Sequence, residues 1–198
     1  LEALAREQER TAERTRILRD MHDGVGAHIS AAIRQLQSGR SSEAEVLQTL
    51  RESLDHLKLT IDAMHLPPGD VTALLASLRY RLEPRLKACG VELQWEVGLI
   101  DPVRRLDAQA MRHLQFMVFE AFSNVLQHAH ASRLRIEANP TQNGVRLRIV
   151  DDGCGFDPLR PGGKGLASLR DRARAIGASL QIDSQPGQTV VDIVIPAD

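Results

Sequence analysis

Six apolar residues recur three or four positions apart between residues 47 and 64, and this spacing predicts one long amphipathic helix. They are Leu47, Leu50, Leu54, Leu57, Ile61 and Met64. Ser42 and Glu45 form a capping box that predicts the start of this helix, and Pro67-Pro68-Gly69 predicts its end. A seam of this length needs a second apolar surface to cover it.

A second helix is predicted upstream, from residue 1 to about Ser38, because Gly39-Arg40 is its first plausible stop. Its early seam is largely polar, so two interpretations stay open: a weak coiled coil or a solvated charged helix. No N-cap precedes residue 1, and we infer that a longer protein has been cut there. The two helices predict a hairpin, and two hairpins in a dimeric four-helix bundle would cover the apolar faces.

The sequence pattern changes after Pro67, which predicts a helical domain over residues 1–67 and a second domain over 68–198. In the second domain the pattern predicts helices over 71–86, 108–130 and 165–176, and strands over 91–97, 134–138, 145–150, 179–182 and 190–195. Turns are expected at Asn143-Gly144 and Pro186-Gly187. The elements interleave without βαβ regularity, so the predicted fold class is α+β, with a mixed, largely antiparallel sheet.

Composition narrows the function. Lys and Arg number 25 against 26 Asp and Glu, so there is no basic field to attract nucleic acid. Cys89 and Cys154 form no CxxC motif, which argues against a disulfide framework or a zinc site. No apolar run is long enough to cross a bilayer, and no signal peptide opens the chain. Alternating arginines at positions 133, 135, 146 and 148 could form a basic stripe, but they fit the solvent face of a half-covered sheet better.

Three stretches of the second domain carry residues suited to chemistry. Glu120, Asn124 and His128 are four residues apart and would share one helical face, where carboxylate and amide oxygens suit Mg²⁺ near a phosphate. Such spacing alone also fits an ordinary solvated face. Asp151–Phe156 (DDGCGF) follows an apolar strand, so its first carboxylate could accept a hydrogen bond from an exocyclic amine, although a plain turn would have the same sequence. Gly162–Leu166 (GGKGL) opens a helix whose free N–H groups suit phosphate, or is simply a flexible loop.

Together these motifs resemble a known family. NVLQHA (124–129), DDGCGF (151–156) and GKGL (163–166) resemble the N, G1 and G2 boxes of the Bergerat-type ATP-binding fold of sensor histidine kinases. RILRDMHDGVG (16–26) resembles the His box of the subfamily that phosphorylates LuxR/NarL-type response regulators. The resemblance covers residues 10–196 and implies a dimerisation and phosphotransfer hairpin followed by an ATP-binding α/β sandwich.

The resemblance implies a role for each matching residue. His22 would accept the γ-phosphoryl group of ATP, and Asp23 would hold or deprotonate its ring. Asn124 would bind Mg²⁺ with support from Glu120, and Asp151 would accept from the adenine amine. His128 and Lys164 are candidates for phosphate contacts, and the pocket and lid would be shaped by Gly153, Gly155, Gly163, Gly165 and Leu166.

Helix geometry tests the His22 assignment independently. At about 100° per residue, His22 lies on the shoulder of an apolar stripe between Leu18 and Leu36, and Asp23 lies further toward solvent. A shoulder position suits a side chain that a second domain must reach. A histidine that merely covers the edge of the bundle is the structural alternative.

Two departures from the family pattern bear on activity. Ala27 stands where many members have the Gln or His used for dephosphorylating the partner, and Gln127 stands where the N box usually has Lys. A degenerate nucleotide-binding or dimerisation scaffold therefore remains an alternative to an active kinase, and a metal phosphohydrolase built on His22 and Asp23 is a second rival. As a kinase core the chain is expected to be a homodimeric cytoplasmic portion, with any anchor to the inner membrane in upstream segments.

Overall fold

The computed structural model describes residues 11–12, 15, 29–30, 32–34, 36–39, 42–63, 65–157 and 164–197. The chain divides into two compact units, Leu1–His65 and Leu66–Asp198. Within the described ranges no helix combines the length and the apolar character needed to cross a membrane.

The described residues of the first unit are helical apart from Gly39, Ser42 and His65. The first helix ends at Gly39, whose φ of 62° is the left-handed conformation that closes many helices. Helix α2 covers Glu43–Ala63. Its predicted capping box is present, because the Ser42 N–H donates to Glu45 Oε2 (2.7 Å) and the Glu45 N–H donates to Ser42 Oγ (3.3 Å).

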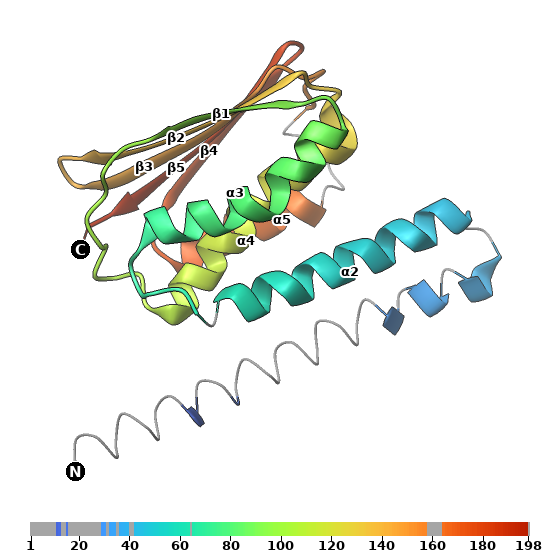
Figure 1. The fold of residues 1–198 in the computed structure, drawn as a ribbon, viewed down its shortest axis with the longest axis horizontal. Helices are drawn as coiled ribbons and strands as arrows, with labels where there is room; N and C mark the ends of the chain where they lie inside the picture. The colour runs from blue at the N-terminus through green and yellow to red at the C-terminus, as the bar shows by residue number, and fades with distance from the viewer. Residues whose placement is uncertain are drawn as a thin grey trace. The chain divides into compact units, whose positions relative to one another are not determined.

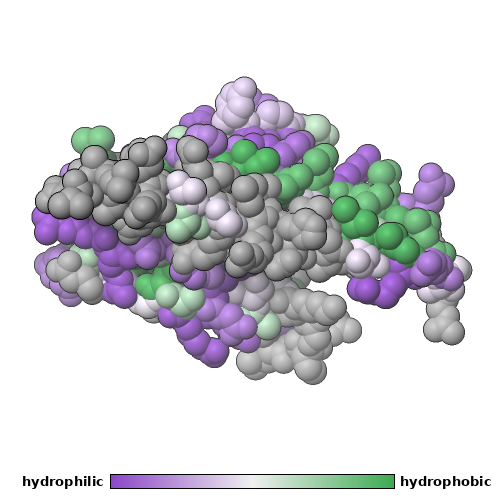
Figure 2. Space-filling view, turned by 90° about the horizontal axis from the view of Figure 1, so that it is seen from below, coloured by the Kyte–Doolittle hydropathy of each residue, from purple (hydrophilic) through white to green (hydrophobic). Residues whose placement is uncertain are grey.

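Four residues of the predicted α2 seam are exposed in the single chain. Leu47, Leu50, Leu54 and Ile61 are 42–49% exposed. Three further apolar side chains of the same unit, Ile29, Ile33 and Leu36, are also exposed. Figure 2 shows apolar surface along the described part of this helical unit. An exposed apolar area of this kind marks an interaction surface.

The second unit is a five-stranded sheet with its helices on one face (Figure 1). Its helices are α3 (Val71–Ala88), α4 (Ala108–Asn124), the π-helix η1 (Val125–Ala129) and α5 (Lys164–Ala175). Its strands are β1 (Glu92–Val97), β2 (Arg133–Thr141), β3 (Gly144–Asp151), β4 (Ser179–Gln185) and β5 (Gln188–Pro196). The strand order is β1-β2-β3-β5-β4, in which β1 and β2 are parallel and all other pairs are antiparallel. The predicted mixed, largely antiparallel sheet is confirmed.

The two faces of the sheet differ in chemistry. The helix side carries buried cross-strand rows, such as Ile136–Ile149–Val191. On the other side Arg148 lies between Glu137 and Asp192, its register partners on the two neighbouring strands. Arg148 Nη1 donates to Glu137 Oε2 at 2.9 Å, and Arg146 pairs with Asp192. The alternating arginines therefore belong to a neutralised outer face, which favours the solvent-face interpretation over a basic stripe.

Three local expectations differ from the structure. The helix predicted over 108–130 is α-helical only to Asn124 and continues as a π-turn. The turn between β2 and β3 is one residue earlier than expected: Gly144 has a φ of 147° and already pairs with Thr141 as the first residue of β3. Helix α3 runs past Leu86 to Ala88 with Pro84 inside it.

Candidate functional site

Asp151 ends β3 in a buried position, where it is only 8% exposed. Its Oδ1 accepts a hydrogen bond from the Gly153 N–H at 2.9 Å. Burial raises the pKa of this carboxyl, the Gly153 N–H opposes that shift, and the charge of Asp152 adds to it. A buried carboxylate with a spare oxygen can select a ligand that presents a hydrogen-bond donor.

Thr189, which sequence reasoning missed, is the register partner of Asp151 on β5. It is 5% exposed and its Oγ1 lies 2.8 Å from Ser184 Oγ. A signal was available, because positions 189, 191, 193 and 195 of β5 all face the core and only Thr189 is polar. The hydroxyl and the carboxylate therefore come from neighbouring strands to one end of the sheet.

The loop after Asp151, residues 151–157 and hereafter the G1 loop, is held by the turn between β4 and β5. The Gly187 N–H donates to the Gly153 carbonyl (2.8 Å), and the Phe156 N–H donates to Ser184 Oγ (2.9 Å). Gly155 has a φ of 69°, and a Cβ there would collide with the backbone of Gln185. Gly155 thus allows close backbone approach, which is the role expected of glycine here.

Helix α4 brings Glu120 to the start of α5. A Cβ on Gly165 would overlap Glu120 Oε1 and would lie 3.3 Å from its Cδ, so only glycine leaves room for this carboxylate. Asn124 follows one turn later on α4, and both side chains are half-buried. The next turn is the π-helix η1, in which residues four positions apart no longer lie directly above one another. The α-helical face expected for Glu120, Asn124 and His128 therefore ends at Asn124.

Arg172 is a further charged group near Glu120, and sequence reasoning did not select it. Its guanidinium lies 4.6 Å from the centre of the Phe116 ring, and its Nε donates to Ser168 Oγ at 3.3 Å. Burial lowers the pKa of Arg172, and the charge of Glu120 partly restores it. Gly165 of α5 thus faces Glu120 of α4, and Arg172 faces Phe116 and His113; helical spacing was the available signal.

The oxygen ligands fit a magnesium ion. Glu120 and Asn124 supply a carboxylate and an amide one turn apart, and Mg²⁺ is usually held by one or two protein oxygens together with substrate phosphates. Among the described residues no three His, Cys, Asp or Glu side chains gather closely enough to hold a metal ion by themselves. A carboxylate and an amide one turn apart suit a metal that arrives with a phosphate ligand.

The remaining predicted residues are only partly described. His22, Asp23 and Gly163 lie outside the described residues. Lys164 begins α5 and Leu166 is half-buried in its first turn, which places the predicted G2 residues at a helix start. At position 127 the Gln amide donates to Ser123 Oγ at 2.9 Å, so a neutral side chain stands where the family pattern has a cation.

This fold, with a buried carboxylate at the end of β3 and a carboxylate–amide pair on α4, agrees with the Bergerat-type ATP-binding fold that the sequence motifs resemble. Residues 110–198 match the family described as "Histidine kinase-, DNA gyrase B-, and HSP90-like ATPase". Residues 13–70 match the HisKA_3 family, described as "Histidine kinase". The chain belongs to the histidine kinases, with a HisKA_3 region followed by the ATPase region.

Curated relatives agree with these matches. The chain is 25% identical over 206 residues to the sensor histidine kinase LiaS of Bacillus subtilis, across 93% of this chain and 54% of that protein. It is 27% identical over 215 residues to the nitrate/nitrite sensor protein NarX of Escherichia coli, across 98% of this chain and 36% of that protein. The chain thus spans about half or less of these relatives' lengths.

Solved structures show the same fold. The histidine kinase AdeS of Acinetobacter baumannii aligns with a TM-score of 0.62 at 20% identity, across 89% of this chain and 98% of that one. The blue-light activated histidine kinase EL346 of Erythrobacter litoralis aligns with a TM-score of 0.65 at 20% identity, across 96% and 60%. The predicted α+β class with an N-terminal helical part is confirmed.

Proposed function

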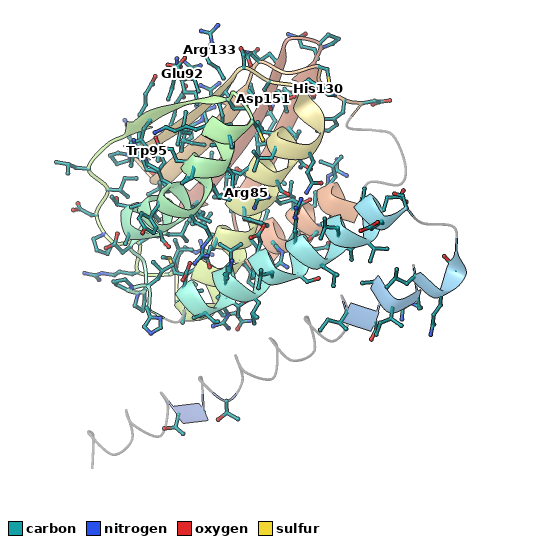
Figure 3. All side chains as sticks on the ribbon, turned by 45° about the vertical axis from the view of Figure 1, so that its right-hand side comes forward. Arg85, Glu92, Trp95, His130, Arg133 and Asp151 are labelled. Atoms are coloured by element: carbon teal, nitrogen blue, oxygen red, sulfur yellow. The ribbon has the colours of Figure 1, made fainter. Side chains whose placement is uncertain are left out.

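We propose that the chain is the core of a two-component sensor histidine kinase, which uses ATP to phosphorylate itself on His22 and passes the phosphoryl group to an aspartate of a NarL-type response regulator. The observation that carries the proposal is the pairing of a HisKA_3 region with an ATPase fold whose end gathers Asp151, Thr189 and the G1 loop. Figure 3 shows Asp151 and His130, which follows η1, at the same end of the unit.

ATP recognition would use the buried end of the sheet. The adenine amine would donate to Asp151, and Thr189 would supply a hydroxyl beside it, either to the base or to a bridging water. The buried carboxylate accepts a donor and repels an acceptor, so adenine is favoured over guanine. Gly155 and Gly165 would shape this end of the site by admitting the Gln185 backbone and the Glu120 carboxylate. Gly153 would let the loop backbone approach the nucleotide, and His128 and Lys164 would contact its phosphates.

In the phosphoryl transfer the imidazole of His22 would attack the γ-phosphorus, forming a P–N bond while the bond to the β-phosphate oxygen breaks and ADP leaves. Asp23 would keep the ring oriented with its attacking lone pair free. Glu120 and Asn124 would hold Mg²⁺, which neutralises phosphate charge. Phosphoryl transfer asks the protein mainly for positioning and charge neutralisation.

We propose that the chain forms a homodimer, and the exposed seam of α2 supports this. Apolar residues at 42–49% exposure along one helix are costly in water and would be covered in a bundle of two hairpins. Replacement of Leu54 by glutamate is expected to shift the sedimentation of the protein toward the monomer, whereas Arg51→Glu, at an exposed polar position of the same helix, should leave the dimer intact.

The decisive test is incubation with γ-labelled ATP and Mg²⁺. Label that is acid-labile and base-stable, lost in His22→Gln and Asn124→Ala and kept in His65→Gln, would support an autokinase; His65 is an exposed histidine of the same unit. Transfer of the label to a NarL-type receiver domain, and its loss when the receiver aspartate is changed to asparagine, tests the partner.

A scaffold function is the second candidate, because Gln127 provides an amide bound to Ser123 where a cation is expected. Absence of label while nucleotide still binds and the dimer persists would favour the scaffold. If the protein is a kinase, we propose that it acts as a cytoplasmic portion and that any membrane anchor lies in upstream segments.

A further inference from the structure

The carboxylate of Asp152 is bound on both of its oxygens. Oδ1 accepts hydrogen bonds from the N–H groups of Ser132 (2.7 Å) and Arg133 (2.8 Å). Oδ2 accepts from Ser132 Oγ at 2.6 Å and lies 3.6 Å from Arg133 Nε. The backbone N–H of Asp152 also donates to the Arg133 carbonyl at 3.3 Å. One residue of the G1 loop therefore fixes the first two residues that enter β2.

The position of these contacts joins two parts of the site that are distant in sequence. Ser132 comes shortly after η1, the turn that continues the helix of Asn124. The chain leaves η1 through His130, which has a left-handed φ of 49°. Asp152 itself follows Asp151 directly. A single carboxylate thus ties the exit of the α4–η1 helix to the carboxylate proposed to recognise adenine.

Strand pairing between β2 and β3 does not by itself join the segment before β2 to the G1 loop. The register between β2 and β3 ends with Leu134 opposite Asp151. Beyond that pair the contact between the two segments is carried by Asp152, through its side chain and its own N–H. Without the side chain, the segment from His130 to Arg133 would keep one long backbone hydrogen bond to the G1 loop.

We infer that Asp152 is a positioning residue for nucleotide selection, because it holds the end of β3 and the exit of η1 in one fixed arrangement. The inference rests on the proposed contact between Asp151 and adenine. Asp152 would not contact the substrate itself; it would act through Asp151 and through the helix of Asn124.

The two oxygens of the Asp152 carboxylate have different partners, and this difference makes the inference testable. Arg133 is 60% exposed, so its ion pair with Asp152 contributes little. Oδ1 accepts both backbone N–H groups, and an asparagine at 152 retains that oxygen. Its amide nitrogen can donate to Ser132 Oγ, since a hydroxyl also accepts. Asparagine should therefore preserve the arrangement that alanine removes.

The experiment measures the dissociation constants of ATP and GTP on the whole chain, together with its Tm. Asp152→Ala is expected to weaken ATP binding about tenfold and GTP binding much less, so that the preference for ATP falls. Asp152→Asn should stay within about twofold of the wild type for both nucleotides. Ser132→Ala removes one of the bonds and should fall between them. Asp171→Ala, an exposed aspartate of α5, is the matched control with no change expected.

Two results would overturn the inference. If Asp152→Ala keeps the full preference for ATP, the residue has no positioning role, even if Tm falls. If asparagine and alanine at 152 reduce the preference equally, the backbone contacts of Oδ1 are not what matters. The variant Asp151→Asn separates a failure of this inference from a failure of the proposed function. If Asp151→Asn loses the preference for ATP, the proposed contact between Asp151 and adenine is supported. If the preference is unchanged, both that contact and the inference about Asp152 are wrong.

Discussion

Replacing Gly165 with alanine tests whether the start of α5 sets the position of the Glu120 carboxylate. The added Cβ would lie well inside 3.0 Å of Glu120 Oε1, a separation that real Cβ atoms essentially never show, and 3.3 Å from Cδ. The backbone at Gly165 has no positive φ, so alanine is compatible with it. The clash is with the end of a flexible side chain, and Glu120 must move aside.

The magnitude follows from the geometry. Ordinary contact begins at 3.4 Å, so the carboxylate has to retreat by about 1 Å, and a displacement of that size can lower a catalytic rate about a hundredfold. Stability should not fall with it, because alanine is favoured over glycine in a helix by up to about 1 kcal/mol. We therefore expect a large loss of autophosphorylation rate with an unchanged or slightly higher Tm.

The assay is single-turnover autophosphorylation at saturating ATP, followed beside thermal unfolding. Ala167→Gly, at an exposed position of the same helix, is the control and should lower Tm while leaving the rate unchanged. In a Glu120→Gln background the Gly165→Ala change should have a much smaller effect, because the displaced group is already disabled. An unchanged rate in Gly165→Ala, or full additivity of the two changes, would refute the reasoning.

Three further predictions concern the sheet and the G1 loop. Gly155→Ala should lower the free energy of unfolding by about 1–3 kcal/mol in urea denaturation, and Gly187→Ala should cost less, because both have positive φ but only a Cβ at 155 meets neighbouring backbone. Burial raises the pKa of Asp151, so folding disfavours the ionised form of this carboxyl. The variant Asp151→Asn is therefore expected to raise Tm at pH 7, and the increase should shrink as the pH falls toward the ordinary aspartate range. An equal Tm of variant and wild type at pH 7 would contradict this. Leu147→Ala, at a fully buried position in the middle of the sheet, should lower the free energy of unfolding by about 2–5 kcal/mol. Leu99→Ala, at a position 98% exposed, should change it by less than about 0.5 kcal/mol. Similar losses of stability in the two variants would show that burial is not the cause.

Features set by a few neighbouring residues could be predicted from the sequence. The capping box at Ser42 depends on one residue three positions away, and the Pro186-Gly187 turn joins β4 to β5 where expected, with Gln185 paired to Gln188. Helix α3 also begins as predicted, since the Asp70 carboxylate accepts from the Ala73 N–H. Hydrogen bonds between residues close in the chain can be predicted, because both partners stand in one short sequence pattern.

Features that depend on distant registers could not be predicted. Thr189 meets Asp151 only because β5 inserts beside β3 in a register set by the whole sheet. Asp152 reaches Ser132 across 20 positions, and nothing in DDGCGF distinguishes its role from that of a turn residue. The π-turn likewise has no local signature, because the apolar spacing of α4 runs through it. The motifs predict which residues matter, while the partners that position them come from the tertiary structure.

The π-turn of η1 also constrains which insertions and deletions this chain can tolerate. A π-turn closes its hydrogen bonds over one residue more than an α-turn. Deleting one residue between Val125 and Ala129 would turn this wide turn into an α-turn and would change the direction of the chain beyond it little. Deleting one residue within Ala108–Asn124 would instead rotate all that follows by about 100° about the helix axis and take the start of β2 away from the carboxylate of Asp152. A gap of one residue should therefore be tolerated better in η1 than in α4.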